Sequence, residues 1–185
     1  PGAVDSVSVS VSSSTEIEPE SAVLTETGPN TSIFTGTIST AIGPAAPGDG
    51  TLQVDHDDLL TATYADADDG TGAKNISFDT LNADCRGPQH VSVAISDITD
   101  STATAAWTTS EPTTGYVEWG TTPALGNQTA SGSLSTSHSV TIGAFNECAT
   151  VYFRVVSADN EGNTGVADVG GAPFEFDAFS VPGIV

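Results

Sequence analysis

Residues 91–120 read VSVAISDITDSTATAAWTTSEPTTGYVEWG, and this stretch decides the fold class. Apolar side chains recur in it at every second position in three runs, which are separated by polar turn residues over 97–101 and 110–114. The alternating apolar residues are Val91, Val93 and Ile95, then Ala103, Ala105 and Trp107, then Val117 and Trp119. A period of two is typical of half-buried strands, because successive side chains of a strand point to opposite faces. The stretch therefore predicts three consecutive β-strands.

The same alternation runs through the rest of the chain. Later residues with this pattern are Val140 and Ile142, then Val151, Phe153 and Val155, then Phe174 and Phe176. Earlier ones are Val7, Val9 and Val11, then Phe34, Gly36, Ile38 and Ile42 in a long strand that can bend at the glycine, then Leu52 and Val54, then Leu60, Ala62 and Tyr64, then Ile76 and Phe78. Val23 and Leu24 form a further apolar pair before the turn residues at 27–30. No segment shows the 3.6-residue period of a helix. We therefore expect an all-β protein built from two tandem antiparallel β-sandwiches.

The length of the chain allows one large domain or two small ones. It has 185 residues, and single cores usually grow to roughly 100–150 residues before a chain divides into domains. We expect two. The segment Asp84-Cys85-Arg86-Gly87-Pro88 interrupts the strand pattern and marks the boundary. We expect one sandwich over residues 1–84, a second over residues 85–179, and a short tail over residues 180–185.

The charge of the chain narrows the choice of partners. It carries 24 acidic residues against 3 lysines and arginines, a net charge of −21. This balance argues against nucleic acids and anionic membranes, because neutralising phosphates takes basic residues that are missing here. No stretch approaches the roughly 18 apolar residues of a membrane span. We therefore expect neither nucleic-acid binding nor membrane insertion.

Catalytic motifs are missing as well. His56, His90 and His138 fall in different predicted elements, and there is no GxSxG, HExxH or phosphate-binding glycine loop. We expect no enzyme. His138 is expected to make a structural hydrogen bond.

Cysteines and glycosylation motifs point to an extracellular or cell-surface protein. The chain has two cysteines, Cys85 and Cys148, and an even count in such a chain favours an oxidised pair; two buried free thiols are the alternative. Acceptor sites for N-glycosylation occur at Asn30, Asn75 and Asn127. In a chain this rich in serine and threonine, some of these motifs are expected by chance.

Aspartates crowd into the end of the first predicted domain. They are Asp55, Asp57, Asp58, Asp66, Asp68 and Asp69. Carboxylate oxygens on loops are ligands that Ca²⁺ prefers, although the spacing differs from that of a helix-loop-helix calcium site. One interpretation is a Ca²⁺ ion that ties the loop after Tyr64 to the turn at 55–58. The alternatives are a solvated acidic loop and a surface adapted to high salt.

The second half resembles a fibronectin type III domain of the bacterial kind, similar to the non-catalytic N-terminal module of purple acid phosphatases. The matching segments are Ile98–Pro112 with Trp107, Val117–Gly120, His138–Ile142, Phe153–Val155 and Asp159–Asn163. The resemblance covers residues 91–179. It implies two antiparallel sheets that close over Trp107 and Trp119.

The chain departs from this family at one corner of the predicted sandwich. Glu147-Cys148 stands where the family usually has Pro-Gly, and Val151 stands where it has a corner tyrosine. The resemblance therefore implies that a bridge from Cys148 to Cys85 replaces the hydrogen bond of the tyrosine.

The first half resembles Ig-like modules of large bacterial and archaeal surface proteins, through residues 24–38 and 59–67. Both resemblances imply non-catalytic modules used for surface display or spacing.

The chain ends favour self-association. Residues 7–11 and 173–185 are apolar and strand-like, and exposed strand edges can be completed by a neighbouring subunit. Our first hypothesis is a subunit of a surface layer or filament that associates with itself by strand complementation. The alternative is a pair of accessory modules of a larger secreted hydrolase or adhesin, with neighbouring domains as partners.

A third hypothesis is glycan binding by an exposed aromatic platform. Its candidate residues are Tyr116, Trp119, Phe145 and Tyr152.

Overall fold

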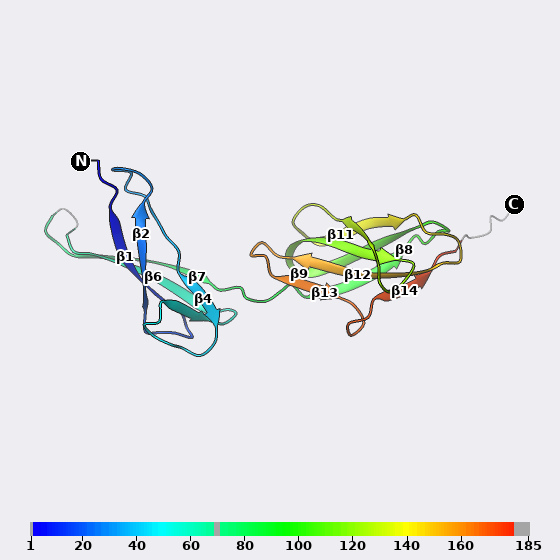
Figure 1. Cartoon of the computed structure of the whole chain (residues 1–185), viewed down its shortest axis with the longest axis horizontal. Helices are drawn as coiled ribbons and strands as arrows, with labels where there is room; N and C mark the ends of the chain where they lie inside the picture. Colours follow the sequence, from blue (N-terminus) through cyan, green and yellow to red (C-terminus); the bar gives the residue numbers. More distant parts are fainter. Residues whose placement is uncertain (1, 69–70, 180–185) are drawn as a thin grey trace. The chain divides into compact units, whose positions relative to one another are not determined.

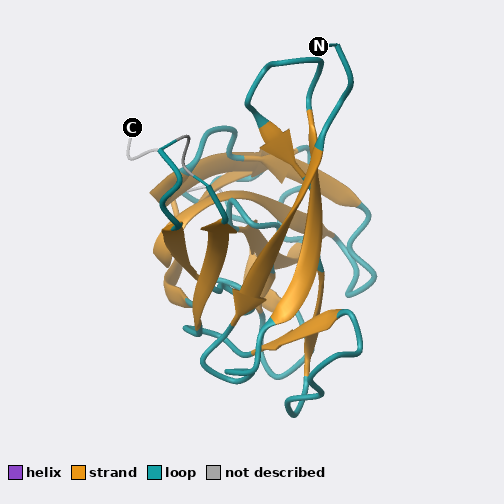
Figure 2. Ribbon diagram, turned by 90° about the vertical axis from the view of Figure 1, so that its left-hand side faces the viewer, coloured by secondary structure: helices purple, strands orange, loops and turns teal. Residues whose placement is uncertain are grey.

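The structure is a computed structural model that describes residues 2–68 and 71–179. Regular structure in these residues consists of β-strands alone (Figure 2), which confirms the all-β fold class. No helix in this part of the chain is long and apolar enough to span a membrane. The chain divides into two compact units, Pro1–Cys85 and Arg86–Val185, which are described separately.

The first unit contains β1 to β7 (Figure 1). They are β1 (Ser6–Ser12), β2 (Glu20–Glu26), β3 (Phe34–Thr35), β4 (Ser39–Ile42), β5 (Thr51–Val54), β6 (Leu59–Asp66) and β7 (Asn75–Asn82). Five of these strands form one antiparallel sheet in the order β3-β2-β1-β6-β7. Its small core joins Val11 and Ala22 of the sheet to Leu52 and Val54 of β5.

Two expectations for the first unit are wrong. The long strand predicted over 34–42 is two short strands, β3 and β4, broken around Gly36. A side chain there would lie 2.6 Å from the carbonyl oxygen of Val23, so the close approach of the backbones requires glycine. In addition, β4 and β5 pair in parallel rather than antiparallel.

The second unit contains β8 to β14. They are β8 (His90–Ser96), β9 (Thr102–Gly120), β10 (Asn127–Ala130), β11 (Ser135–Gly143), β12 (Thr150–Ala158), β13 (Thr164–Ala167) and β14 (Phe174–Asp177). The expected turn at 110–114 is absent, because β9 is one continuous strand. Its first part pairs with β8 and β11, and its last part pairs with β10 and β12.

The change of partners along β9 creates the core of the second unit. Ala105 and Trp107 from its first part share a buried cluster with Val117 and Trp119 from its last part. The antiparallel sheet therefore curls over and encloses these side chains. Phe153 of β12 completes the cluster from the neighbouring strand.

A buried polar network lies at one side of this core. The ring of His138 stacks on Trp107, with centroids 4.8 Å apart, and its Nε2 is 3.0 Å from Thr113 Oγ1. Its Nδ1 is 2.8 Å from Ser131 Oγ. His138 therefore has a structural role, as the sequence suggested.

Candidate functional site

The most unusual feature of the first unit is β7, an edge strand that is exposed along its whole length. Among the described strands it pairs only with β6 (Figure 1). Three of its apolar side chains are largely exposed, Ile76 at 67%, Phe78 at 71% and Leu81 at 70%. A long edge of this kind is a template for pairing with another strand, because its outer N–H and C=O groups lack partners within the sheet.

The exposed apolar side chains of β7 lie on both faces of the sheet. Phe78 lies opposite Thr63 of β6, on the face that carries the serines of β1. Leu81 lies opposite Leu60, on the face that carries the core. On this core face two open grooves of about 240 Å³ each run along β6 and β7, lined among others by Val9, Val11 and Leu60. The core face is thus incompletely covered beside β7.

The N-terminal strand is only partly free to pair with another subunit. Residues 7–11 belong to β1, which pairs with β2 along this length, whereas only Ser10 and Val11 of these residues also pair with β6. Strand complementation through residues 7–9 therefore stays a prediction. The second predicted donor includes residues 180–185, which lie outside the described residues.

Several carboxylates of the first unit hold its loops together. Glu16, which is 0% exposed, accepts hydrogen bonds from the backbone N–H of Ala46 at 3.2 Å and of Gln53 at 2.8 Å. Glu20 accepts from Gly48 and Gly50 in the same way. A buried charge is tolerated only when such donors replace water. These acids therefore stabilise the fold, and the high acidic content is only partly a surface property.

Two further carboxylates are stabilised in their charged form. Hydrogen bonds from the backbone N–H of Asp55 and from Thr15 lower the pKa of Asp58 below its ordinary value. The backbone N–H of Ser32, followed by that of Asp5, lowers the pKa of Glu26.

Acid is therefore expected to destabilise the first unit. In the unfolded chain these carboxyls return to pKa values near 4, so the unfolded chain binds more protons and stability falls as the pH drops through and below this range. The urea midpoint of the first unit, followed through its NMR amide signals from pH 7 to pH 3, should show this loss. Asp58→Asn should lower the urea midpoint at pH 7 and make the midpoint depend less on pH. If the midpoint of the variant changed with pH as steeply as that of the parent, Asp58 would not contribute to the loss of stability in acid.

The aspartates proposed as calcium ligands do not come together. Asp55, Asp57 and Asp58 lie before β6, and Asp66 and Asp68 lie at its far end. Asp66 follows Asp58 by eight positions along extended chain, about 26 Å at a rise of 3.3 Å per residue. One ion cannot join the two groups, and no three of these described residues gather closely enough to hold an ion. Asp69 lies outside the described residues.

The cysteine pairing stays a prediction. Cys85 ends the first unit and Cys148 belongs to the second, and each is a free thiol within its own unit. The three predicted glycosylation sites, Asn30, Asn75 and Asn127, have exposed side chains.

The predicted aromatic platform is not exposed as a whole. Trp119 and Phe145 are buried and pack edge to face at 6.1 Å, which makes them core residues. Tyr116 and Tyr152 are partly buried on neighbouring strands.

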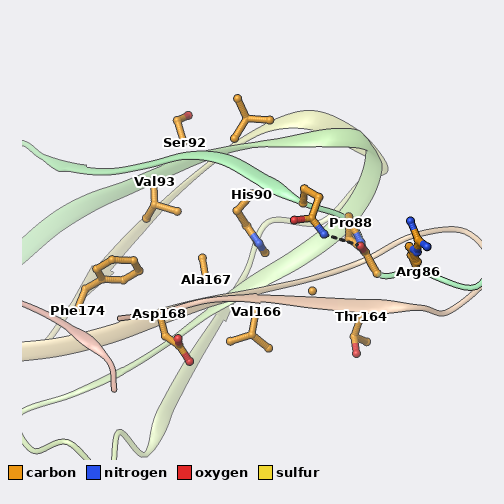
Figure 3. Close-up of a pocket in the computed structure, with 14 residues that line it drawn as sticks. Arg86, Pro88, His90, Ser92, Val93, Thr164, Val166, Ala167, Asp168 and Phe174 are labelled. Atoms are coloured by element: carbon orange, nitrogen blue, oxygen red, sulfur yellow. Dashed lines mark hydrogen bonds between the residues drawn. The ribbon is translucent and has the colours of Figure 1, made fainter. Parts of the chain in front are cut away.

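A groove of about 690 Å³ lies between β8 and β13 of the second unit. Figure 3 shows His90 and Val93 pointing from β8 towards Ala167 of β13. His90 Nε2 lies 3.1 Å from Ser157 Oγ, but Ser157 is fully buried and also accepts a hydrogen bond from Trp107 Nε1. Burial, and then the proximity of His138, lower the pKa of His90. This pair supports the core rather than presenting a nucleophile.

Comparison with known proteins adds no assignment. The chain matches no protein-family model, and it matches no curated protein. The exposed edge of the first unit is therefore the feature that points to a function. Sequence alternation predicted a strand at 76–78, but it could not reveal that this strand lies at the edge of the sheet.

Proposed function

We propose that the protein is a non-enzymatic extracellular structural protein, a subunit of a cell-surface layer or filament that associates with itself through strand pairing. The observation that carries this proposal is β7, whose edge is unpaired in the described structure and whose apolar side chains are exposed. Monomeric proteins usually protect such edges with charged side chains, proline or a bulge. β7 has no proline and no bulge, and Asp79 is its sole charged residue.

We also infer that the two units are an Ig-like and a fibronectin type III-like sandwich. Support for the second comes from β9, which joins β8 and β11 to β10 and β12 over a common core. Trp107, Val117, Trp119 and Phe153 carry the resemblance in sequence and are buried in that core. The fold of the first unit is supported by its five-stranded antiparallel sheet and the β4-β5 pair.

The surface chemistry supports an extracellular location. The asparagines of the three glycosylation motifs are exposed, and a net charge of −21 keeps the chain soluble in high salt. The same charge opposes self-association, because copies of the chain repel each other until salt screens them. Association should therefore strengthen as sodium chloride rises.

Analytical ultracentrifugation of the full chain, with negative-stain microscopy of the same samples, tests the proposal. We expect mass to increase with protein concentration from micromolar to millimolar, and more strongly at high salt. Adding Ca²⁺ at matched ionic strength separates calcium binding from simple screening. A monomer under all these conditions would overturn the proposal and favour accessory modules of a larger secreted protein.

A further inference from the structure

The exposed edge of β7 is chemically suited to meeting a copy of itself. β7 reads Asn75-Ile76-Ser77-Phe78-Asp79-Thr80-Leu81-Asn82, with Asp79 as its sole charged residue. A chain of net charge −21 repels its copies over most of its surface. With one carboxylate in eight residues, β7 lets two copies approach without bringing several carboxylates together.

Symmetry restricts how two such strands can pair. Residues that lie directly opposite each other in an antiparallel pair point to the same face of the sheet. Side chains alternate between the faces, so opposite positions must differ by an even number of residues. For identical strands related by a two-fold axis, the residue on the axis therefore lies opposite its own copy. Two registers pair the greatest length within β7. One is centred on Phe78 and uses residues 75–81, and the other is centred on Asp79 and uses residues 76–82.

Charge decides between these registers. Centring on Asp79 places two carboxylates directly opposite each other, which is destabilising. Centring on Phe78 places Asp79 opposite Ser77 of the second copy and Ile76 opposite Thr80, and it leaves the two Asp79 side chains diagonal, about 7–8 Å apart, instead of directly opposite. The two phenylalanine rings then face each other across the axis, and aromatic cross-strand pairs are stabilising.

The residue that precedes β7 adds a positive charge to a chain of net charge −21. Lys74 is the sole lysine of the chain, and its side chain is exposed. In the register centred on Phe78 it lies opposite Asn82 of the second copy, whose side-chain oxygen can accept a hydrogen bond from the ammonium group. The symmetric contact therefore has one lysine at each of its two ends, and the two lysines do not oppose each other.

We propose that two copies of this chain pair through β7 in antiparallel orientation, with Phe78 opposite Phe78, and so join their five-stranded sheets into one continuous sheet. This proposal rests on the self-association proposed above and specifies the edge and the register. It uses fewer residues per copy than the roughly 20–30 of a standard interface. The dimer is therefore a weak one, and layers or filaments need a second contact elsewhere on the chain.

Cysteine cross-linking of the full chain tests the register. Under mild oxidation Phe78→Cys should form a covalent dimer, because directly opposite α-carbons lie about 4.5–5.5 Å apart, within disulfide range. Ser77→Cys with Asp79→Cys in the same chain should cross-link through unlike positions, as mapped by mass spectrometry. Asp79→Cys alone should form no more covalent dimer than the parent chain. The parent chain retains Cys85 and Cys148 and therefore gives the background level. If the Asp79→Cys variant formed a covalent dimer and the Phe78→Cys variant did not, the proposed register would be overturned.

Charge variants test the edge. Phe78→Lys should weaken dimerisation in ultracentrifugation by at least about tenfold, because two lysines then oppose each other. Val23→Lys is the matched control: Val23 is 60% exposed on the same face of the sheet, but on β2. If Phe78→Lys leaves the association unchanged, the pairing through β7 is overturned, but the proposal that the chain associates with itself stands. A parent chain that is monomeric throughout overturns both proposals.

Discussion

Replacing Trp107 by alanine is expected to destabilise the second unit by about 3–5 kcal/mol, the usual cost of removing a large aromatic side chain from a core. Trp107 is 1% exposed, stacks on His138 and donates a hydrogen bond from Nε1 to Ser157 Oγ at 3.1 Å. Its loss leaves a cavity at the point where the two parts of β9 share their core. Because domains of this size are stable by only about 5–15 kcal/mol, the variant should be close to unfolding.

Urea unfolding followed by the fluorescence of Trp119 measures this loss, since Trp119 lies in the same core cluster. The free energy of unfolding of Trp107→Phe should lie between those of the parent and the alanine variant, because phenylalanine keeps a ring against His138 but loses the hydrogen bond. Val91→Ala is the control. Val91 is 71% exposed on β8, and its truncation should change stability by less than about 0.5 kcal/mol. Equal effects at positions 91 and 107 would show that Trp107 does not anchor the core.

Alternation along the chain predicted most strands because they are buried on one face only. It failed at 110–114, where Ser110, Glu111 and Pro112 have the composition of a turn. In the fold this segment stays extended, and Thr109 Oγ1 donates to the carbonyl of Glu111 and lies 3.3 Å from Thr113 Oγ1. Thr113 Oγ1 also lies 3.0 Å from Nε2 of His138 on β11, a contact that depends on the tertiary structure and that the local sequence does not reveal.

The acidic residues show a second limit of the sequence. Their density suggested one calcium site, but local spacing does not reveal which carboxylates turn inward. Glu16 stands next to the exposed Ile17 and Glu18, and nothing in this segment marks it as buried. Its partners, Ala46 and Gln53, lie far along the chain, so that only the fold brings them together.

Replacing Glu16 by alanine is expected to destabilise the first unit by about 1–3 kcal/mol, because the backbone N–H of Gln53 loses its acceptor inside the protein. The N–H of Ala46 also loses Glu16 but keeps Gln53 Oε1 at 3.0 Å. Ser13 belongs to the same cluster, since its hydroxyl accepts from the N–H of Glu16 and donates to the carbonyl of Gln53. The loop at 43–50 should loosen first, because Ala46 lies within it. Hydrogen exchange at Ala46 and Gln53, together with the urea midpoint of the first unit, measures both effects.

A conservative pair of variants separates the lost acceptor from the lost charge. Glu16→Gln keeps the shape of the side chain but turns an amide donor towards a backbone N–H, so most of the destabilisation should remain. Glu18→Gln removes the same charge from an exposed position two residues away and should change stability by less than about 0.5 kcal/mol. If the two glutamine variants were equally stable, net charge rather than the buried hydrogen bonds would control the first unit. A selective loss at Glu16 would show that an acidic residue in this chain serves as a buried acceptor for its own loops, since Glu18 carries the same charge without those contacts.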